Sequence, residues 1–492
     1  MNIRRLLAAL LSLFALSLPS LRAEKPNVVF ILADDLGYTD LACYGSGYYE
    51  TPNIDRLASQ GMRFTNHHHA QNCQPTRAAL MSGQYGPRTG VYTVGGIDRF
   101  DWSSRPLRPV DNVTELPLDR TTIAQSFKAA GYETAMFGKW HLGEKGEYLP
   151  GRRGFDEAIV SSGRHFKFTT IPPVEVSPET YLADFLTDKA EDFIRRKNDV
   201  PFFLYLPHFG VHSPHQAKPD LIAHFEPKAP VGGHHDPVYA AMIASVDESV
   251  GRIMTLLEEL KIAENTVLVF ASDNGGVGGY AREGINKESG DITDNAPLRS
   301  GKGSLYEGGT RVPLIVRWPG VVKPGTCNAP TIHVDLPATF LEIAAAPAPA
   351  QMLDGESLVP VLKDPAAALK RTAIYQHFPG YLGAGKDSWR TTPVGLIQSG
   401  DWKLMEFYED GRLELYNLSK DIGESHNLAV EMPDTAKELH EQLKLWRTGV
   451  GAKMPTPNTV TPDQREVKKG KKKGQGKNKG ASTGPEGKTP GD

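Results

Sequence analysis

The sequence predicts an α/β fold: a large mixed, mainly parallel sheet sandwiched by helices, followed by a smaller C-terminal antiparallel sheet with a helix. Three observations predict it. The chain has 492 residues, which is enough for one large domain and a smaller one. Four continuous apolar runs are bounded by turn residues, as in strands buried on both faces of a parallel sheet. Helical patterns separate these runs, which favours a layered α/β architecture.

The apolar runs are followed by polar side chains. The runs span residues 27–33, 202–206, 266–271 and 312–316. Asp34 and Asp35 follow the first run, His208 and His212 the second, and Asp273 the third. Ligands bind at the carboxyl ends of parallel strands, so we expect these side chains to lie close together. Helices are predicted at 121–130 and 239–260, the first capped by Thr121 or Thr122.

The pattern changes near residues 364–371, which divides a catalytic domain (24–366) from an α+β subdomain (367–454). Short antiparallel strands are predicted at 394–397, 402–407 and 413–416, and an amphipathic helix at 435–446 packs on them. Residues 455–492 are rich in Pro, then in Lys and Gly. A segment with so few apolar residues cannot bury a core, so it is predicted to be disordered.

The N-terminus has the features of an export signal. Arg4 and Arg5 precede an apolar run at 6–18, and the small Ala23 follows. This run is too short to span a bilayer, so residues 1–23 are predicted to be a signal peptide. No later segment is apolar and long enough to cross a membrane. We therefore expect an exported protein, periplasmic or secreted, without a transmembrane segment.

Cysteine content and charge exclude two classes. Three cysteines, Cys43, Cys73 and Cys327, are too few for a disulfide scaffold. Cys43 and Cys327 are either free buried thiols or a pair. The formal net charge of −3 is the sum of +5 in residues 455–492 and −8 in the rest of the chain. The acidic charge of the rest of the chain argues against nucleic acid as a partner. The tail is interpreted as solubilising, with binding to a polyanion or a surface as the alternative.

Acidic pairs at two strand ends predict a metal site. Asp34, Asp35, Asp273 and Asn274 lie far apart in sequence. Carboxylates packed together repel each other and lose hydration, and a hard cation removes that cost. An all-oxygen set selects Ca²⁺ or Mg²⁺ over zinc. The alternative is that they are ordinary turn residues.

A cysteine before a helical run is the candidate nucleophile. Cys73 begins the segment CQPTR, and an apolar helical run follows Pro75. We expect Cys73 at a helix N-terminus, where backbone N–H groups favour an anion, and Arg77 one turn further on. The alternative is a small packed residue.

Three further segments supply cationic side chains. Lys139 and His141 stand two residues apart in GKWHLG, so in an extended segment they point the same way. His212 lies in HSPH, and Lys302 lies in a Gly-rich segment that lacks the spacing of a P-loop. Each has a plain alternative as a loop residue. Together, a cation site, a nucleophile and excess basic groups suit hydrolysis of a tetrahedral oxyanion ester.

The order of these segments resembles that of type I, formylglycine-dependent sulfatases of the alkaline-phosphatase-like superfamily. The resemblance runs from about Lys25 to Leu428 and depends most on Cys-x-Pro-x-Arg at Cys73. The corroborating segments are PNVVFILADDLGYTDLACYG, GKWHLG, GVHSPH, SDNGG, GKGSLYEGGTRVPLIVRWPG and ELYNLSKDIGESHNLA. Gln74 and Ser82 depart from the family pattern, which has a small residue and Thr there.

The resemblance implies roles for these residues. Cys73 is converted to Cα-formylglycine by a formylglycine-generating enzyme that reads Pro75 and Arg77, and the aldehyde hydrates to a diol. The implied Ca²⁺ ligands, with Mg²⁺ the less favoured metal, are Asp34, Asp35, Cys73, Asp273 and Asn274. Arg77 and Lys139 stabilise the diol, and His141 contacts the hydroxyl that does not attack. Lys139, His212 and Lys302 bind the sulfate, and His212 or Lys302 protonates the leaving oxygen. A sulfo-enzyme intermediate follows.

Other polar residues are weaker candidates. His67, His68 and His69 resemble a metal tract but are interpreted as supports of the pocket. A further contact of the family falls on Ser161 or Ser162. Sugar or carboxylate contacts are considered, against solvated loop positions, at Arg164, His165, His234, His235, His377, Trp389 and Arg390.

The predicted function is hydrolysis of a sulfate monoester, on a carbohydrate or an aryl sulfate. One alternative is a phosphodiesterase or phosphonate hydrolase of the same superfamily. Such two-metal enzymes use Ser or Thr as nucleophile and an Asp-His pair where this chain has Asp273 and Asn274. The other alternative is an inactive binder of sulfated glycans, which predicts a damaged site. The sequence does not identify the sugar.

Overall fold

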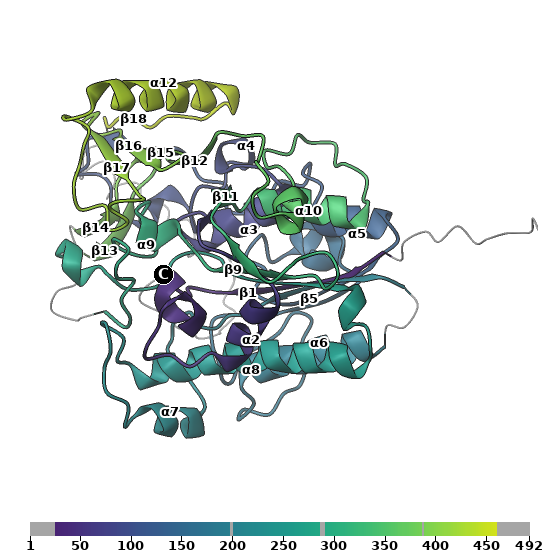
Figure 1. The fold of residues 1–492 in the computed structure, drawn as a ribbon. Coiled ribbons are helices and arrows are strands. Elements are labelled where there is room, and N and C mark those ends of the chain that lie inside the picture. The colour runs from purple at the N-terminus through teal and green to yellow at the C-terminus, as the bar shows by residue number, and fades with distance from the viewer. Residues whose placement is uncertain (1–24, 197–199, 286–290, 386–387, 460–492) are drawn as a thin grey trace, which may run out of the picture.

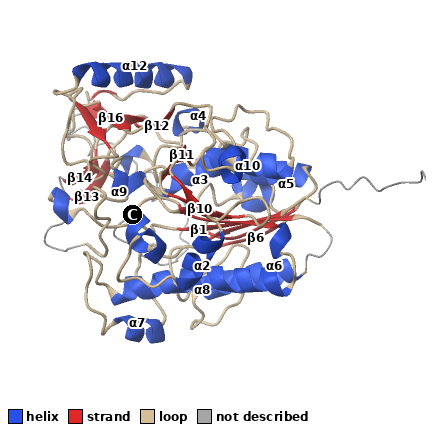
Figure 2. Cartoon of the chain, viewed as in Figure 1, coloured by secondary structure: helices blue, strands red, loops and turns tan. Residues whose placement is uncertain are grey.

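The computed structural model describes residues 25–196, 200–285, 291–385 and 388–459. The predicted signal peptide and most of the predicted tail lie outside these ranges. One large sheet lies between two layers of helices, and a smaller sheet with one long helix stands beside them (Figures 1 and 2). No helix in the described ranges is long and apolar enough to cross a membrane.

The large sheet has eight strands, of which only one is antiparallel to its neighbours. The strands in spatial order are β10 (Gly325–Cys327), β2 (Met62–Phe64), β9 (Leu314–Arg317), β8 (Thr266–Ser272), β1 (Asn27–Ala33), β7 (Phe202–Pro207), β5 (Glu133–Gly138) and β6 (Glu157–Val160). The mainly parallel sheet is confirmed. The exception is β9, whose sequence suggested a parallel strand. The chain between β8 and β9 turns at one sheet edge without a full crossover helix, so β9 runs back against β8.

Helices cover both faces of this sheet. One face carries α2 (Pro52–Gln60), α6 (Leu182–Arg195) and α8 (Pro237–Glu259), and α7 (Pro219–Phe225) packs on the outer side of α8. The other carries α3 (Cys73–Ser82), α4 (Gly86–Thr89), α5 (Ile123–Ala129), α10 (Asp335–Ala344) and α11 (Val359–Lys363). The unbroken apolar run of β1 follows from this, because Val29 and Ile31 enter one buried cluster while Val28 and Phe30 enter the other.

Capping side chains set the start of two predicted helices. The Thr122 hydroxyl accepts from Gln125 N (3.2 Å), and the Gln125 side chain accepts from Thr122 N (2.8 Å), which forms a capping box at α5. Asp236 accepts from Tyr239 N at the start of α8. Thr122, rather than Thr121, is therefore the cap.

The C-terminal subdomain contains a four-stranded antiparallel sheet under α12 (Pro433–Gly449). Its strands are β12 (Ala373–Phe378), β15 (Val394–Ser399), β16 (Trp402–Phe407) and β17 (Leu413–Asn417). Three of these strands and the helix agree with the predicted positions. The sequence analysis missed β12 and the hairpin of β13 (Leu382–Gly385) with β14 (Ser388–Thr391). The two hairpin strands have only four residues each, whereas β12 is as long as β15 and was simply not recognised.

The ordered chain extends beyond Pro455, where the disordered tail was predicted to begin. β18 (Thr456–Pro457) pairs with β4 (Leu107–Arg108). The Asn458 side chain donates to Ser103 O (2.9 Å) and to Arg105 O (2.8 Å). Backbone pairing and side-chain hydrogen bonds place these residues without any apolar burial, which composition alone does not reveal.

The remaining elements are short. They are β3 (His67–His68), which pairs with β11 (Thr331–Ile332), α9 (Glu307–Thr310), and the 3-10 helices η1 (Tyr38–Asp40), η2 (Ala42–Tyr44), η3 (Ile97–Arg99), η4 (Gly146–Tyr148), η5 (Pro150–Arg152), η6 (Ala263–Asn265) and η7 (Ala281–Glu283).

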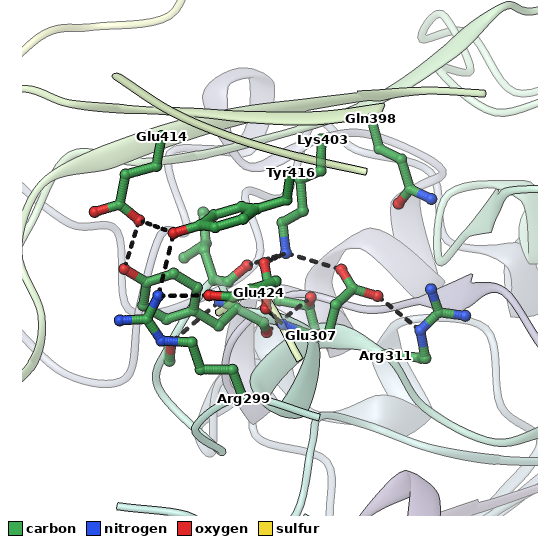
Figure 3. A network of polar contacts seen from close by, with 12 residues as sticks. Arg299, Glu307, Arg311, Gln398, Lys403, Glu414, Tyr416 and Glu424 are labelled. Atoms are coloured by element: carbon green, nitrogen blue, oxygen red, sulfur yellow. Dashed lines mark hydrogen bonds and ion pairs between the residues drawn. The ribbon is translucent and has the colours of Figure 1, made fainter. Parts of the chain in front are cut away.

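A buried network of charges joins the subdomain to the catalytic domain (Figure 3). Lys403 of β16 lies 2.8 Å from both Glu307 Oε1 and Glu424 Oε1, and it donates to Leu305 O. All three charged side chains are at most 1% exposed. Arg311 Nε lies 2.6 Å from Glu307 Oε2. Because Lys403 alone stands between the two carboxylates, its loss leaves buried negative charge.

We expect Lys403→Met to lower the free energy of unfolding by about 3–5 kcal/mol, because removing one partner of a buried ion pair leaves the other uncompensated. Urea unfolding of wild type and variant measures this difference in the free energy of unfolding. Lys444→Met is the matched control, since Lys444 forms an exposed pair with Glu441 and its loss should cost at most about 1 kcal/mol. Equal stability of the two variants would contradict the role of Lys403.

Candidate active site

The carboxyl ends of β1 and β8 bring the predicted acidic residues together. Ala33 pairs with Ser272, so Asp34 and Asp273 follow side by side. Asp35 N donates to Asp273 Oδ1 (3.2 Å), and Asn274 Nδ2 donates to Asp35 Oδ1 (2.8 Å). All four of these residues are buried. The structure therefore assembles the predicted acidic cluster at one edge of the sheet.

Three basic side chains surround these acids. Lys139 Nζ lies 2.7 Å from Asp34 Oδ2, and Lys302 Nζ lies 2.8 Å from Asp35 Oδ2. Arg77 Nη2 lies 2.7 Å from Asp273 Oδ2 and 3.5 Å from Asp34 Oδ2. The site is thus a buried cluster of alternating charges drawn from five separate segments.

The acids differ in how burial and their neighbours act on them. Burial would raise the pKa of Asp34, but the cationic Lys139 and its neighbours outweigh burial and lower it. Burial, together with the Asp34 carboxylate, raises the pKa of Asp273 well above its usual range. The two carboxyl groups therefore respond in opposite directions although they lie side by side.

Cys73 is the first residue of α3, as the sequence predicted. Its side chain is 1% exposed, and Sγ lies within 4.8 Å of carboxylate oxygens of Asp34 and Asp273. Arg77, one turn later, donates to Lys139 O (2.7 Å) as well as to Asp273. The helix start therefore places the sulfur, the guanidinium and the acids in one buried cluster.

Lys139 and His141 are not held by an extended segment. Lys139 follows β5, and its N–H donates to Pro207 O (2.8 Å). His141 has φ 61°, in the left-handed region, so the chain turns where an extended strand was predicted. Gln74 Nε2 donates to His141 O (3.2 Å). The residue that departs from the family pattern therefore supports the turn that carries His141.

His212 reaches the site from the loop after β7. Its Nδ1–H donates to Ser213 O (2.7 Å), and its Nε2 lies 3.6 Å from Asp35 Oδ2. Burial and the two lysines lower the pKa of His212, but the adjacent aspartates raise it, and the net direction is upward. His165 Nε2 donates to His212 O (2.8 Å) and so fixes the loop.

Close backbone packing holds the loop that carries Lys302. Lys302 N donates to Gly276 O (3.0 Å), and Gly303 N donates to Gln71 O (2.7 Å), just before Cys73. A Cβ on Gly275 would lie 1.9 Å from Gly308 O, so only glycine fits there. Glycine at position 275 therefore allows the backbone there to approach the backbone at Gly308.

Several weaker candidates have structural roles instead. His67 Nε2 lies 2.8 Å from His69 Nε2, and His68 bonds Glu307, so the histidine tract supports the site. His165, His234 and His377 were considered as sugar contacts or solvated positions, but all three are buried and bonded to backbone carbonyls.

The structure also places the remaining weaker candidates and the two other cysteines. Arg164, His235 and Ser162 are exposed, and Trp389 and Arg390 are partly exposed. The Ser161 hydroxyl donates to Thr169 O. Cys43 and Cys327 are free thiols.

Two residues that the sequence analysis missed, Gln71 and Tyr280, support the site through hydrogen bonds to the loop of Lys302. Two others, Gln74 and His165, were named there, but their supporting roles were not predicted. The sequence contains no signal for these roles, because each residue acts on a segment remote in sequence. Tyr280, for example, donates its hydroxyl to Lys302 O (2.7 Å).

The donor set fits a hard cation. Asn274 Oδ1 is buried and accepts no hydrogen bond from any described residue. Both Asp34 oxygens are likewise buried without a hydrogen bond from any described residue, and Oδ2 forms ion pairs with Lys139 and Arg77. Carboxylate and amide oxygens are the ligands that Ca²⁺ prefers. The residues present would therefore hold such an ion through Asp34, Asp35, Asp273 and Asn274.

Comparisons with known proteins agree with this geometry. A model of the sulfatase family matches residues 26–346, and a model of the N-sulphoglucosamine sulphohydrolase C-terminal region matches 301–448. A sulfatase of Formosa agariphila is 35% identical, with 87% of this chain and 91% of that protein covered. Human arylsulfatase A is 31% identical, with 86% and 87% covered. An N-acetylgalactosamine-6-O-sulfatase of Bacteroides thetaiotaomicron is 30% identical, with 87% and 94% covered.

Solved structures share the fold. The crystal structure of Ps i-CgsB in complex with k-i-k-neocarrahexaose has a TM-score of 0.74 at 27% identity, covering 92% of this chain and 98% of that one. A phosphonate monoester hydrolase of Agrobacterium radiobacter has a TM-score of 0.63 at 19% identity, covering 86% and 96%, which shows the fold alone. With the family model matching well over half of the sequence, the chain belongs to the sulfatase family and is a sulfuric ester hydrolase.

Proposed function

We propose that the protein hydrolyses a sulfate monoester of a carbohydrate, with Cys73 matured to Cα-formylglycine. Ca²⁺ would be held by Asp34, Asp35, Asp273 and Asn274, together with the matured residue 73. One observation carries the proposal. The Cys73 side chain, at the start of α3, lies within 4.8 Å of Asp34 and Asp273 inside a ring of basic groups. Relatives that act on sulfated sugars, such as the N-acetylgalactosamine-6-O-sulfatase, support a carbohydrate substrate.

The proposed reaction requires two groups, the matured residue 73 and a bound Ca²⁺. A formylglycine hydrate at position 73 supplies a hydroxyl nucleophile with a second hydroxyl beside it, and Ca²⁺ supplies fixed positive charge at the strand ends. Maturation requires a formylglycine-generating enzyme, for which Pro75 and Arg77 belong to the recognised pattern. The predicted export signal fits a protein that meets extracellular polysaccharides.

The basic side chains bind and orient the ester. Lys139 and Lys302 approach the cluster from different segments and offset the charge of the sulfate oxygens. Arg77 is fixed by Asp273 and by Lys139 O, so its guanidinium stays beside position 73. His141 stands two residues after Lys139, where we propose that it contacts the non-attacking hydroxyl.

His212 is the candidate that protonates the leaving oxygen. Its Nδ1–H is committed to Ser213 O, so Nε2 is the nitrogen that faces the cluster near Asp35. Lys302, 2.8 Å from the same carboxylate, is the alternative donor. Excluding bulk water, which the burial of all these groups indicates, strengthens each interaction.

The two alternatives have weaker support. The phosphonate monoester hydrolase shares only the fold, and Asn274 with Cys73 favours a one-metal sulfatase. Parallel assays on an aryl sulfate and a phosphate diester separate the two reactions, and a strong preference for the diester would reverse the proposal. An inactive glycan binder predicts a damaged site, whereas every core position is filled here.

We expect Cys73→Ala to lower kcat on an aryl sulfate by at least about 10³-fold, because it removes the nucleophile. Mass spectrometry of the digested wild type, coexpressed with a formylglycine-generating enzyme, should show loss of the thiol-to-aldehyde mass difference in the peptide of Cys73. Cys43→Ala, at a free thiol outside the site, should keep full activity. An unmodified Cys73 in an active enzyme would contradict the maturation.

We expect removal of Ca²⁺ by EGTA to lower the melting temperature, since an ion bound to the folded state stabilises it by about 2.7 kcal/mol at 100 times its Kd. Asn274→Ala should weaken this Ca²⁺-dependent shift, because Asn274 Oδ1 faces no other partner among the described residues. Asn328→Ala, at an exposed site, is the control and should keep the shift. A full shift in Asn274→Ala would remove Asn274 from the ligand set.

A further inference from the structure

The β13–β14 hairpin brings Arg390 to the loop of Lys302. A Cβ built on Gly303 would lie 3.2 Å from Arg390 Cδ and 2.9 Å from Leu382 Cδ2. Gly303 directly follows Lys302, whose ammonium group lies against Asp35. In Figure 1 the two strands are drawn beside α9, at the end of the same loop. The subdomain therefore places a second cation next to the proposed sulfate site.

Tyr280 connects the two cations. The Arg390 guanidinium lies over the Tyr280 ring, 4.7 Å from its centroid, and the Tyr280 hydroxyl donates to Lys302 O (2.7 Å). Tyr280 is 2% exposed, so the ring is a fixed platform. Stacking on a buried ring orients the plane of the guanidinium relative to Lys302.

Arg390 lacks an anionic partner in the described part of the chain. Other arginines of this region have one: Arg299 pairs with Glu283, Arg105 with Glu409 and Arg412 with Asp410. No described carboxylate pairs with Arg390, and its Nε is buried without a hydrogen bond to any described residue. A buried N–H donor left unsatisfied costs about 1–3 kcal/mol. An acceptor supplied by a ligand would remove that cost.

We propose that Arg390 determines specificity by binding a second oxyanion of the substrate, a sulfate or a carboxylate on the sugar that carries the scissile sulfate or on its neighbour. This inference rests on the proposed function. The planar fork of a guanidinium matches the two oxygens of either group. Lys302 and Arg390 would then bind two anionic groups of one saccharide at the same time. The substrate class is therefore an oligosaccharide with at least two negative groups.

The test compares wild type, Arg390→Ala and Arg390→Lys. The probes are 4-nitrophenyl sulfate, a monosulfated neutral disaccharide, a disulfated disaccharide and a monosulfated disaccharide with a uronic acid. Each saccharide is measured as a substrate and as a competitor of 4-nitrophenyl sulfate, so a saccharide that is not cleaved still reports its affinity. The last two probes distinguish a second sulfate from a carboxylate.

Wild type should favour at least one doubly anionic probe over the neutral disaccharide. In Arg390→Ala, the ratio of kcat/KM, or of inverse Ki, for that probe relative to the neutral one should fall about 10–100-fold, as expected for a lost charged hydrogen bond. The ratio for Arg390→Lys should lie between those of wild type and Arg390→Ala, because lysine keeps the positive charge but lacks the planar guanidinium. Arg412→Ala, an arginine of the same subdomain that already pairs with Asp410, should leave every ratio unchanged.

Two outcomes overturn the inference. The first is that wild type makes no distinction between singly and doubly anionic saccharides. The second is that Arg390→Ala keeps the wild-type ratio within about twofold, a change smaller than the loss of a charged hydrogen bond would cause. Both leave the sulfatase proposal intact as long as 4-nitrophenyl sulfate is cleaved. Failure to cleave any sulfate ester after maturation is a separate result, and it contradicts the proposed function itself.

Discussion

The pairing of β1 with β8 is the constraint on which the site depends. The register sets Ala33 against Ser272, so each strand ends at the same edge with an acidic residue next. Asp273 N donates to Ala33 O, which continues the pairing one step beyond the strands. A shift of one residue would turn these side chains to the other face, away from Cys73. The buried apolar faces of both strands oppose such a shift.

Charge compensation then selects what stands around the acids. Buried carboxylates require countercharge, and Lys139, Lys302 and Arg77 provide it from three separate segments. The same groups are suited to a tetrahedral anion, which is the role that we propose for them. These ion pairs offset the cost of burying charged groups at this edge of the sheet.

The C-terminal subdomain contributes to the site in two ways. Through Lys403 it neutralises Glu307 and Glu424, and so holds the end of the loop that begins near Lys302 (Figure 3). Through its hairpin it presents Arg390 beside that loop. The first contact is buried and structural, whereas the second reaches partly exposed surface. One part of the subdomain thus anchors the loop of Lys302, and another part brings an arginine beside it.

The sequence by itself determined the α/β class, the central strands, and the acids and cysteine of the site, because apolar runs and the residues that end them are local signals. It did not determine the direction of β9, the left-handed turn at His141 or the β13–β14 hairpin. Nor did it separate His165, buried behind His212, from a surface histidine. These features depend on contacts between segments remote in sequence. Only the tertiary structure decides them, because burial and partners are properties of the packed chain.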